Sequence, residues 1–79
     1  MARVRLFAAA AEVIGAHEVV IEAESVGELR EKLIGEGGPT AQNVITRCSL
    51  LLNGTRTKSN LTPVHADTQV DVLPPFAGG

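Results

Sequence analysis

The order of two hydrophobic periodicities constrains the fold of this chain more than any other feature. Segments in which apolar and polar residues alternate, the period of a half-buried strand, lie near both ends of the sequence. Between them lies one longer segment whose apolar residues recur at helical spacing. The predicted strands are residues 2–7, 17–23, 49–52, 55–57 and 69–73, and the main predicted helix is Val26–Leu33. Strands that flank one main helix predict an α+β domain with the helix packed across a sheet.

Local signals mark the ends of these segments. Ser25 and Glu28 form a capping-box pattern that predicts a helix start at residue 26, and the glycine-rich stretch 35–39 predicts its end. Asn53-Gly54 is the strongest short signal for a hairpin turn, because both residues tolerate positive φ. Two further short helices are expected, one near residues 8–13 and one over 40–47.

The alternation also predicts which side chains of the first and last strands face away from the core. Val4 and Leu6 share one face of the first strand, so Phe7 lies on the other. Leu73 stands in the same relation to Val70 and Val72. If these strands are neighbours in the middle of the sheet, Phe7 and Leu73 form an exposed apolar patch, the kind that often marks a partner site. The alternative is that a loop or the second short helix covers them.

Size and composition exclude several classes of function. A chain of 79 residues buries only roughly 60% of the surface that its unfolded form exposes, which allows one thin core and one domain. The net charge of −2, with two Phe and no Trp or Tyr, gives neither a basic surface nor a stacking platform for nucleic acid. No apolar run approaches a membrane span, and Glu12 interrupts the Ala8–Ala11 run, so we expect a cytoplasmic protein.

The remaining chemically capable residues give no strong motif. With one cysteine and two histidines, no recognised zinc spacing is possible, and no metal site is predicted. Cys48 could be a redox or sulfur-relay thiol, or simply a small buried residue. The acidic side chains of residues 22–31 could form a docking face for a partner, or they could simply be the solvent-exposed side of a hairpin and a helix.

The C-terminal residues are unusual in composition. Pro74-Pro75 stiffen the exit from the last predicted strand and cannot donate to a ladder. Phe76-Ala77 follow, and then Gly78-Gly79. Because neither glycine carries a Cβ, such a segment can enter a narrow active-site tunnel where a side chain would clash. We therefore expect a folded domain over residues 1–75 and a flexible, functional tail over 76–79.

These segments together resemble a known family. The stretch Val72–Gly79 is similar to the end of the molybdopterin synthase small subunit, within the MoaD/ThiS-type family of ubiquitin-like sulfur carriers. Val4–Ala8 resembles the family's opening strand, Ser25–Leu29 its helix start, and Leu52–Gly54 its Asn-containing turn. The resemblance covers essentially the whole chain, and it implies a β-grasp fold, a mixed sheet with one main helix packed across it.

The resemblance also implies a chemistry. The Gly79 carboxylate would be adenylylated, converted to a thiocarboxylate, and used to donate sulfur to a pterin precursor in molybdenum cofactor biosynthesis, with Gly78 in the threaded segment. Phe7, Leu73 and the segment Pro74-Pro75-Phe76-Ala77 would contact partners. No cofactor is expected to be bound by the chain itself.

Three partners follow from the same resemblance: the large subunit of molybdopterin synthase, an adenylyltransferase of the ubiquitin-activating type that uses ATP, and a sulfurtransferase as sulfur donor. The catalytic groups would belong to them, so the chain would not be an enzyme alone. Arg56 departs from the family, where related chains often carry an apolar residue, and this predicts a more polar interface.

Other functions remain open from the sequence. A carrier for thiazole or cysteine synthesis would use the same terminus, although the long Ala8–Ala16 connection argues against the thiazole type. A ubiquitin-like modifier would use the same activation to join lysines. A plain interaction module would have an inert tail.

Overall fold

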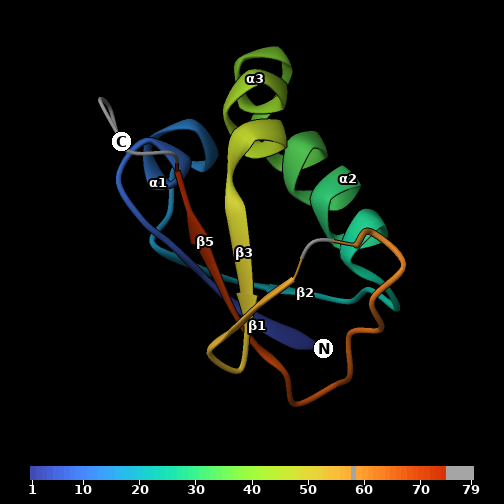
Figure 1. The fold of residues 1–79 in the computed structure, drawn as a ribbon. Helices are drawn as coiled ribbons and strands as arrows, with labels where there is room; N and C mark the ends of the chain where they lie inside the picture. The colour runs from blue at the N-terminus through green and yellow to red at the C-terminus, as the bar shows by residue number, and fades with distance from the viewer. Residues whose placement is uncertain (58, 75–79) are drawn as a thin grey trace.

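The computed structural model of the chain describes residues 1–57 and 59–74. Its elements are β1 Ala2–Leu6, α1 Ala9–Ile14, β2 Glu18–Ile21, α2 Val26–Gly37, α3 Pro39–Arg47, β3 Ser49–Leu52, β4 Thr55–Thr57 and β5 Gln69–Leu73 (Figure 1). Every predicted strand and helix is present, and the largest boundary difference is at the end of α2. The predicted boundary between domain and tail falls outside these residues and stays a prediction.

The five strands form one mixed sheet in the order β2-β1-β5-β3-β4. The first and last strands, β1 and β5, run parallel in its middle, with Val4 opposite Val70 and Leu6 opposite Val72. The other three pairings are antiparallel. The condition for the Phe7–Leu73 patch, that the first and last strands are neighbours in the middle of the sheet, is therefore met.

The core lies between the sheet and the helices. Val26, Leu29 and Leu33 of α2 are fully buried and pack with alternate residues of the strands, namely Val4, Leu6, Leu50, Val70 and Val72. This confirms the helix face that was predicted. The apolar run Ser49–Leu52 forms β3, which has a neighbouring strand on each side. Leu50 is fully buried and Leu52 is partly buried against the same core, whereas Leu51 is partly exposed on the face of the sheet that helices do not cover.

The start of α2 is fixed by two reciprocal hydrogen bonds. The Ser25 hydroxyl accepts from the Glu28 backbone N–H at 3.2 Å, as the capping box predicts. The Glu28 carboxylate reaches back to the N–H of Glu24 at 2.8 Å, one residue earlier than the Ser25 N–H of a standard box. The Val26 and Gly27 N–H groups donate to the Thr62 and Asn60 carbonyls, both at 2.9 Å, so the free donors of the first turn also have partners.

The end of α2 lies further along the chain than the glycines suggest. The helix continues through Gly35 to Gly37, and Gly38 ends it with φ 82°. A Cβ at Gly37 would lie 2.6 Å from the Val13 carbonyl oxygen and 2.6 Å from the Ala41 Cβ. Gly37 is therefore a point of close approach between α1, α2 and α3, and the break comes one residue after it.

The predicted turn at Asn53-Gly54 joins β3 to β4. Both residues have positive φ, 49° and 86°, as a two-residue hairpin turn of the primed type requires. Asn53 also exchanges hydrogen bonds with Gln69. Its N–H donates to the Gln69 carbonyl at 2.8 Å, and its side-chain Oδ1 accepts from the Gln69 N–H at 2.9 Å. The turn is thereby tied to the start of β5.

Ala8, between β1 and α1, has a strained backbone. Its φ of 52° and ψ of −126° are adopted readily only by glycine, and they let the Ala10 N–H donate to the Phe7 carbonyl at 3.1 Å. Such a residue costs about 1–3 kcal/mol. We expect Ala8→Gly to raise the free energy of unfolding by about 1 kcal/mol, after the greater entropy of the unfolded glycine chain is subtracted. Urea unfolding measures this.

Ala9→Gly is the matched control, because Ala9 is the first residue of α1 and lies in ordinary helical backbone. That variant should lose stability. If Ala8→Gly lost stability by the same amount, the strain at Ala8 would be disproved.

Candidate functional site

One side of the sheet is not covered by helices, and we call it the open face. The strand register places on it the residues that alternate with the core: Arg3, Arg5 and Phe7 from β1 and its end, Glu18 and Val20 from β2, Ser49 and Leu51 from β3, Arg56 from β4, and Gln69, Asp71 and Leu73 from β5. None of these residues is buried. The open face is therefore available for contact with another molecule.

The apolar end of the open face lies where the chain leaves β5. The Phe7 N–H donates to the Val72 carbonyl at 3.2 Å, so Phe7 lies next to Leu73 on the neighbouring strand. Phe7 is 39% exposed. Leu73 is half-buried rather than exposed, because it stands between Phe7 and Ser49 in the middle of the sheet. The predicted patch is thus confirmed in position, and its exposed part is mostly the Phe7 ring.

A bidentate ion pair occupies the centre of the open face. Arg5 donates from Nε to Asp71 Oδ1 at 2.9 Å and from Nη2 to Asp71 Oδ2 at 3.2 Å. The hydrogen bond to Asp71 raises the pKa of Arg5, so the guanidinium remains charged. It also lies over the Phe7 ring, 5.9 Å from the ring centroid. The bidentate contact fixes the orientation of the guanidinium, and its position over the ring helps to hold Phe7 in place.

Sequence reasoning missed this pair and the other end of the open face. Arg5 and Asp71 are 66 positions apart, and only the parallel register of β1 and β5 brings them opposite each other. Val20, on β2, is 59% exposed and lies opposite Arg3. The alternation in residues 17–23 was the one signal that placed Val20 outside the core.

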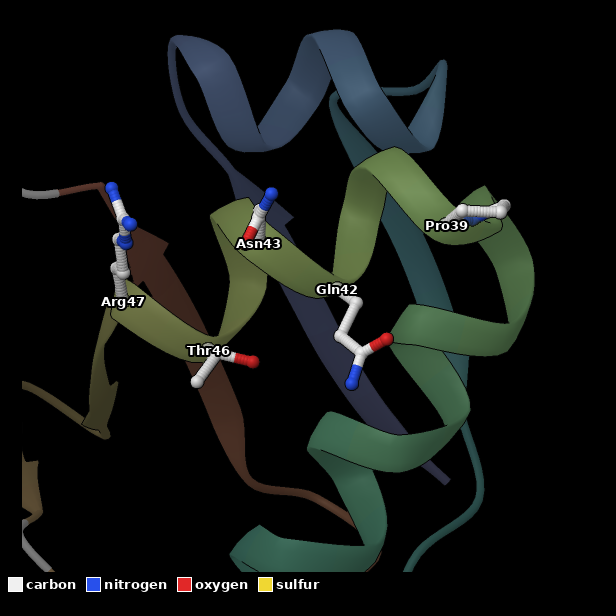
Figure 2. Close-up of a pocket in the computed structure, with 5 residues that line it drawn as sticks. All are labelled: Pro39, Gln42, Asn43, Thr46 and Arg47. Atoms are coloured by element: carbon white, nitrogen blue, oxygen red, sulfur yellow. The ribbon is translucent and has the colours of Figure 1, made fainter.

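Pro74, the last described residue, lines a recess against α1 and α3. The recess has a volume of about 230 Å³ and is formed with residues of α1 and α3: Ala9, Asn43, Val44 and Arg47. A second recess of about 280 Å³ on α3 shares Asn43 and Arg47 with it and is otherwise lined by Pro39, Gln42 and Thr46 (Figure 2). Both are shallow and open, and among their described lining residues Arg47 is the one charged group. Neither offers an acid–base pair.

The other predicted partner and tail residues, Pro75, Phe76, Ala77, Gly78 and Gly79, lie outside the described residues. Their roles stay predictions. What the structure does place is the point from which that segment starts, at Pro74 after the end of β5.

Cys48 is a buried residue rather than an accessible thiol. It is 4% exposed and its Sγ donates to the Val44 carbonyl at 3.1 Å. Burial raises the pKa of the Cys48 thiol, which disfavours the reactive thiolate. Arg30 caps the same helix end by donating to the Ile45 and Cys48 carbonyls at 2.8 and 3.2 Å. These contacts favour the structural interpretation of Cys48.

The described part of the chain contains neither a metal-ligand cluster nor a membrane-spanning helix. No group of three His, Cys, Asp or Glu side chains there is placed to hold a metal ion. His17 and His65 are both exposed. Within residues 1–57 and 59–74, no helix has the length and apolar character that crossing a membrane requires.

Comparison with known proteins identifies relatives of the whole chain. The ThiS family model matches residues 4–79. Curated protein sequences gave no significant match. The small archaeal modifier protein 1 (SAMP1) of Methanosarcina acetivorans is similar in structure, with a TM-score of 0.85 and 23% identity over 99% of this chain and 95% of that chain. SAMP1 of Haloferax volcanii gives 0.76 and 24% over 99% and 98%. The fold is thus the ubiquitin-like β-grasp that the sequence resemblance implied.

A third similar structure comes from a complex. A chain of the complex of subunits 1 and 2 of the molybdopterin-converting factor of Helicobacter pylori has a TM-score of 0.73 and 26% identity, over 99% of this chain and 97% of that chain. The chain studied here is thus similar both to modifier proteins and to a component of a molybdopterin-converting complex.

Proposed function

Because the chain belongs to the ThiS family, whose model matches residues 4–79, we propose that it is a sulfur carrier that uses a thiocarboxylate on Gly79. We propose further that it acts as the small subunit of molybdopterin synthase and donates this sulfur to a pterin precursor. The observation that carries the proposal is the position of Pro74. The segment with the two glycines starts there, beside the exposed Phe7 and the rest of the open face.

The proposed chemistry explains why a carboxylate at the end of a glycine segment is useful. A carboxylate is a poor electrophile, so an oxygen of Gly79 first attacks the α-phosphate of ATP on the activating partner and pyrophosphate leaves. A persulfide from the sulfur donor then attacks the acyl carbon and displaces AMP. A thiol cleaves the resulting sulfur–sulfur bond, which leaves a thiocarboxylate on Gly79 and a disulfide on the donor. The thiocarboxylate sulfur is a strong nucleophile toward the pterin precursor.

The proposal assigns the chain two tasks, to present the terminus and to dock. The partners are the large subunit, an adenylyltransferase of the ubiquitin-activating type and a sulfurtransferase. The Helicobacter pylori structure, in which subunits 1 and 2 of the molybdopterin-converting factor form a complex, supports the first of these. The identity of the molecule that accepts the sulfur is a separate claim from the carrier role, and it needs its own test.

A single-turnover transfer experiment tests the acceptor. The chain, loaded with sulfur and purified, is mixed with the large subunit and the pterin precursor, and intact mass is followed with time. The proposal predicts that sulfur is lost from the chain as the precursor gains it, and that omission of the large subunit stops the transfer. Retention of the sulfur by the loaded chain in the complete mixture would reject the molybdopterin role.

A second candidate function is protein modification, which the likeness to two SAMP1 structures favours. The same adenylated Gly79 would then react with a lysine amine to form an isopeptide bond. Denaturing electrophoresis and peptide mass analysis of cells that produce the chain distinguish the two. A modifier yields covalent conjugates in which Gly79 is joined to a lysine, and a dedicated carrier yields none. Because no Lys or Arg follows position 58, trypsin leaves residues 59–79 on the modified lysine, and this branch is the mass to seek.

The docking site leads to a specific prediction. Phe7→Glu should weaken binding of the large subunit by roughly 30-fold or more, because a truncated aromatic anchor typically costs about 2 kcal/mol or more, and the variant also adds a charge to an apolar contact. The fold should survive, since Phe7 is already partly exposed. Titration calorimetry measures the affinity, and a thermal melt checks the fold.

Leu61→Glu is the matched control, because Leu61 is 87% exposed and lies in the loop before β5, away from Phe7. It should bind the large subunit normally. Equal affinity of the Phe7 and Leu61 variants would place the docking site elsewhere, and a lost melting transition in Phe7→Glu would show that Phe7 supports the core.

A further inference from the structure

The charges of the chain are distributed unevenly between the open face and the rest of the molecule. The open face carries three arginines, Arg3, Arg5 and Arg56, against two carboxylates, Glu18 and Asp71. The rest of the sequence carries four basic and seven acidic residues, so the chain as a whole has a net charge of −2. The open face therefore carries a net charge of +1, three basic minus two acidic side chains, whereas the rest of the sequence carries −3.

The three arginines are not equivalent. Arg5 is neutralised by its bidentate contact with Asp71 in the centre of the face. Arg3 and Arg56 are exposed, and within residues 1–57 and 59–74 neither forms an ion pair. They lie on β1 and β4, with two strands between them. Their Cα atoms are about 16 Å apart, from strand spacings of about 4.8 Å and a rise of about 3.3 Å per residue.

Apolar side chains lie around and between the two exposed arginines. Val20 lies opposite Arg3, and Leu51 lies opposite Arg56. Phe7 and Leu73 continue the apolar surface toward the end of β5. The neutralised Arg5–Asp71 pair lies among these side chains in the centre of the face, so Arg3 and Arg56 are the outlying charges. Charges at the rim of a protein–protein interface select the partner and speed its encounter.

We propose that the open face binds a protein surface with an acidic rim, and that Arg3 and Arg56 are its specificity-determining residues, each facing a carboxylate of the partner. The inference rests on the proposed function and commits to one partner, the large subunit. Charge complementarity supports this choice, because two guanidinium groups that form no ion pair within the described residues, held about 16 Å apart by the sheet, fit two carboxylates at a similar spacing on the partner. A second copy of this chain is disfavoured as the occupant, because its own open face would place arginines against arginines.

The proposal predicts how the binding rate depends on charge and salt. Attraction between a basic face and an acidic rim raises the association rate and is screened by ions. We expect Arg3→Glu and Arg56→Glu each to lower the association rate constant by about 3–10-fold at low salt, and the double variant by more. The dissociation rate should change less. In the double variant the association rate should no longer fall as salt is added.

Stopped-flow mixing of the full-length chain with the large subunit, from low to high salt, measures these rates. Lys32→Glu is the matched control, since it makes the same change of charge on the exposed side of α2, away from the open face. Arg3→Lys and Arg56→Lys should bind nearly as fast as the unchanged chain. Thermal melts confirm that each variant is folded.

The outcomes separate this inference from the proposed function. If the unchanged chain binds the large subunit, but the glutamate variants and the Lys32 control bind at the same rate, the arginine proposal is wrong and the carrier proposal stands. If the unchanged chain does not bind the large subunit, both fail. A concentration-dependent dimer in gel filtration that Arg3→Glu dissociates would show that a second copy occupies the face, and would also overturn the proposal.

Discussion

Deletion of Gly79 should abolish sulfur loading and leave the stability of the domain unchanged. Under the proposed mechanism the adenylate and then the thiocarboxylate form on the carboxylate of this residue. Deletion moves the reacting carboxylate back by one residue, about 3.3 Å or more, and a displacement of about 1 Å can already cost on the order of 100-fold in rate. Stability should not change, because the described core ends at Val72. Intact mass measures the loading.

Two variants sharpen this prediction. A tag added after Gly79 should also prevent loading, because it displaces the carboxylate and adds side chains to the threaded segment. Gly78→Ala should slow loading without abolishing it, since a Cβ narrows the fit and restricts the backbone. If the tagged chain gained sulfur at the normal rate with its tag intact, the carboxylate mechanism would be refuted.

Replacement of Leu33 by alanine should lower the free energy of unfolding by about 2–5 kcal/mol, because the substitution leaves a cavity in a packed core. Leu33 has no exposed surface and lies on the α2 face that packs against the sheet. For a domain of this size each kcal/mol lowers the melting temperature by about 4–8 °C. The loss is a large part of the stability that a small domain has.

Urea unfolding with an exposed leucine as control tests the packing. Leu61→Ala should change the free energy of unfolding by less than about 0.5 kcal/mol, because Leu61 is exposed. If Leu33→Ala were as stable as Leu61→Ala, the placement of α2 on the sheet would be wrong.

Much of the fold could be predicted from local patterns. The alternation in β1 and β5, the capping box before α2 and the Asn53-Gly54 turn each have a local physical cause, and the structure confirms each. The end of α2 could not be predicted in the same way. A run of glycines indicates that a helix stops, but packing of α1 against Gly37 decides where. The strain at Ala8 has no sequence signal, because alanine there looks like part of a helix.

The candidate site was predicted only in part, for a related reason. The alternation within each strand predicts that the side chains of Phe7 and Leu73 point away from the core. The parallel pairing of β1 with β5 brings them together. The Arg5–Asp71 pair and the separation of Arg3 from Arg56 depend on the register between strands that are far apart in sequence. Register is a tertiary property, so the charged part of the open face becomes visible only once the sheet is assembled.

The central claim, that Gly79 carries the sulfur, is tested most directly by intact and C-terminal peptide mass after incubation with the activating partner, ATP and a sulfur donor. The account predicts that one oxygen is replaced by sulfur, that the change lies on the C-terminal peptide, that it requires ATP, and that dithiothreitol does not remove it. A sulfur added to Cys48 as a persulfide would give a different mass change and would be lost to dithiothreitol. A C-terminal peptide that stays unmodified in the complete mixture would contradict the account.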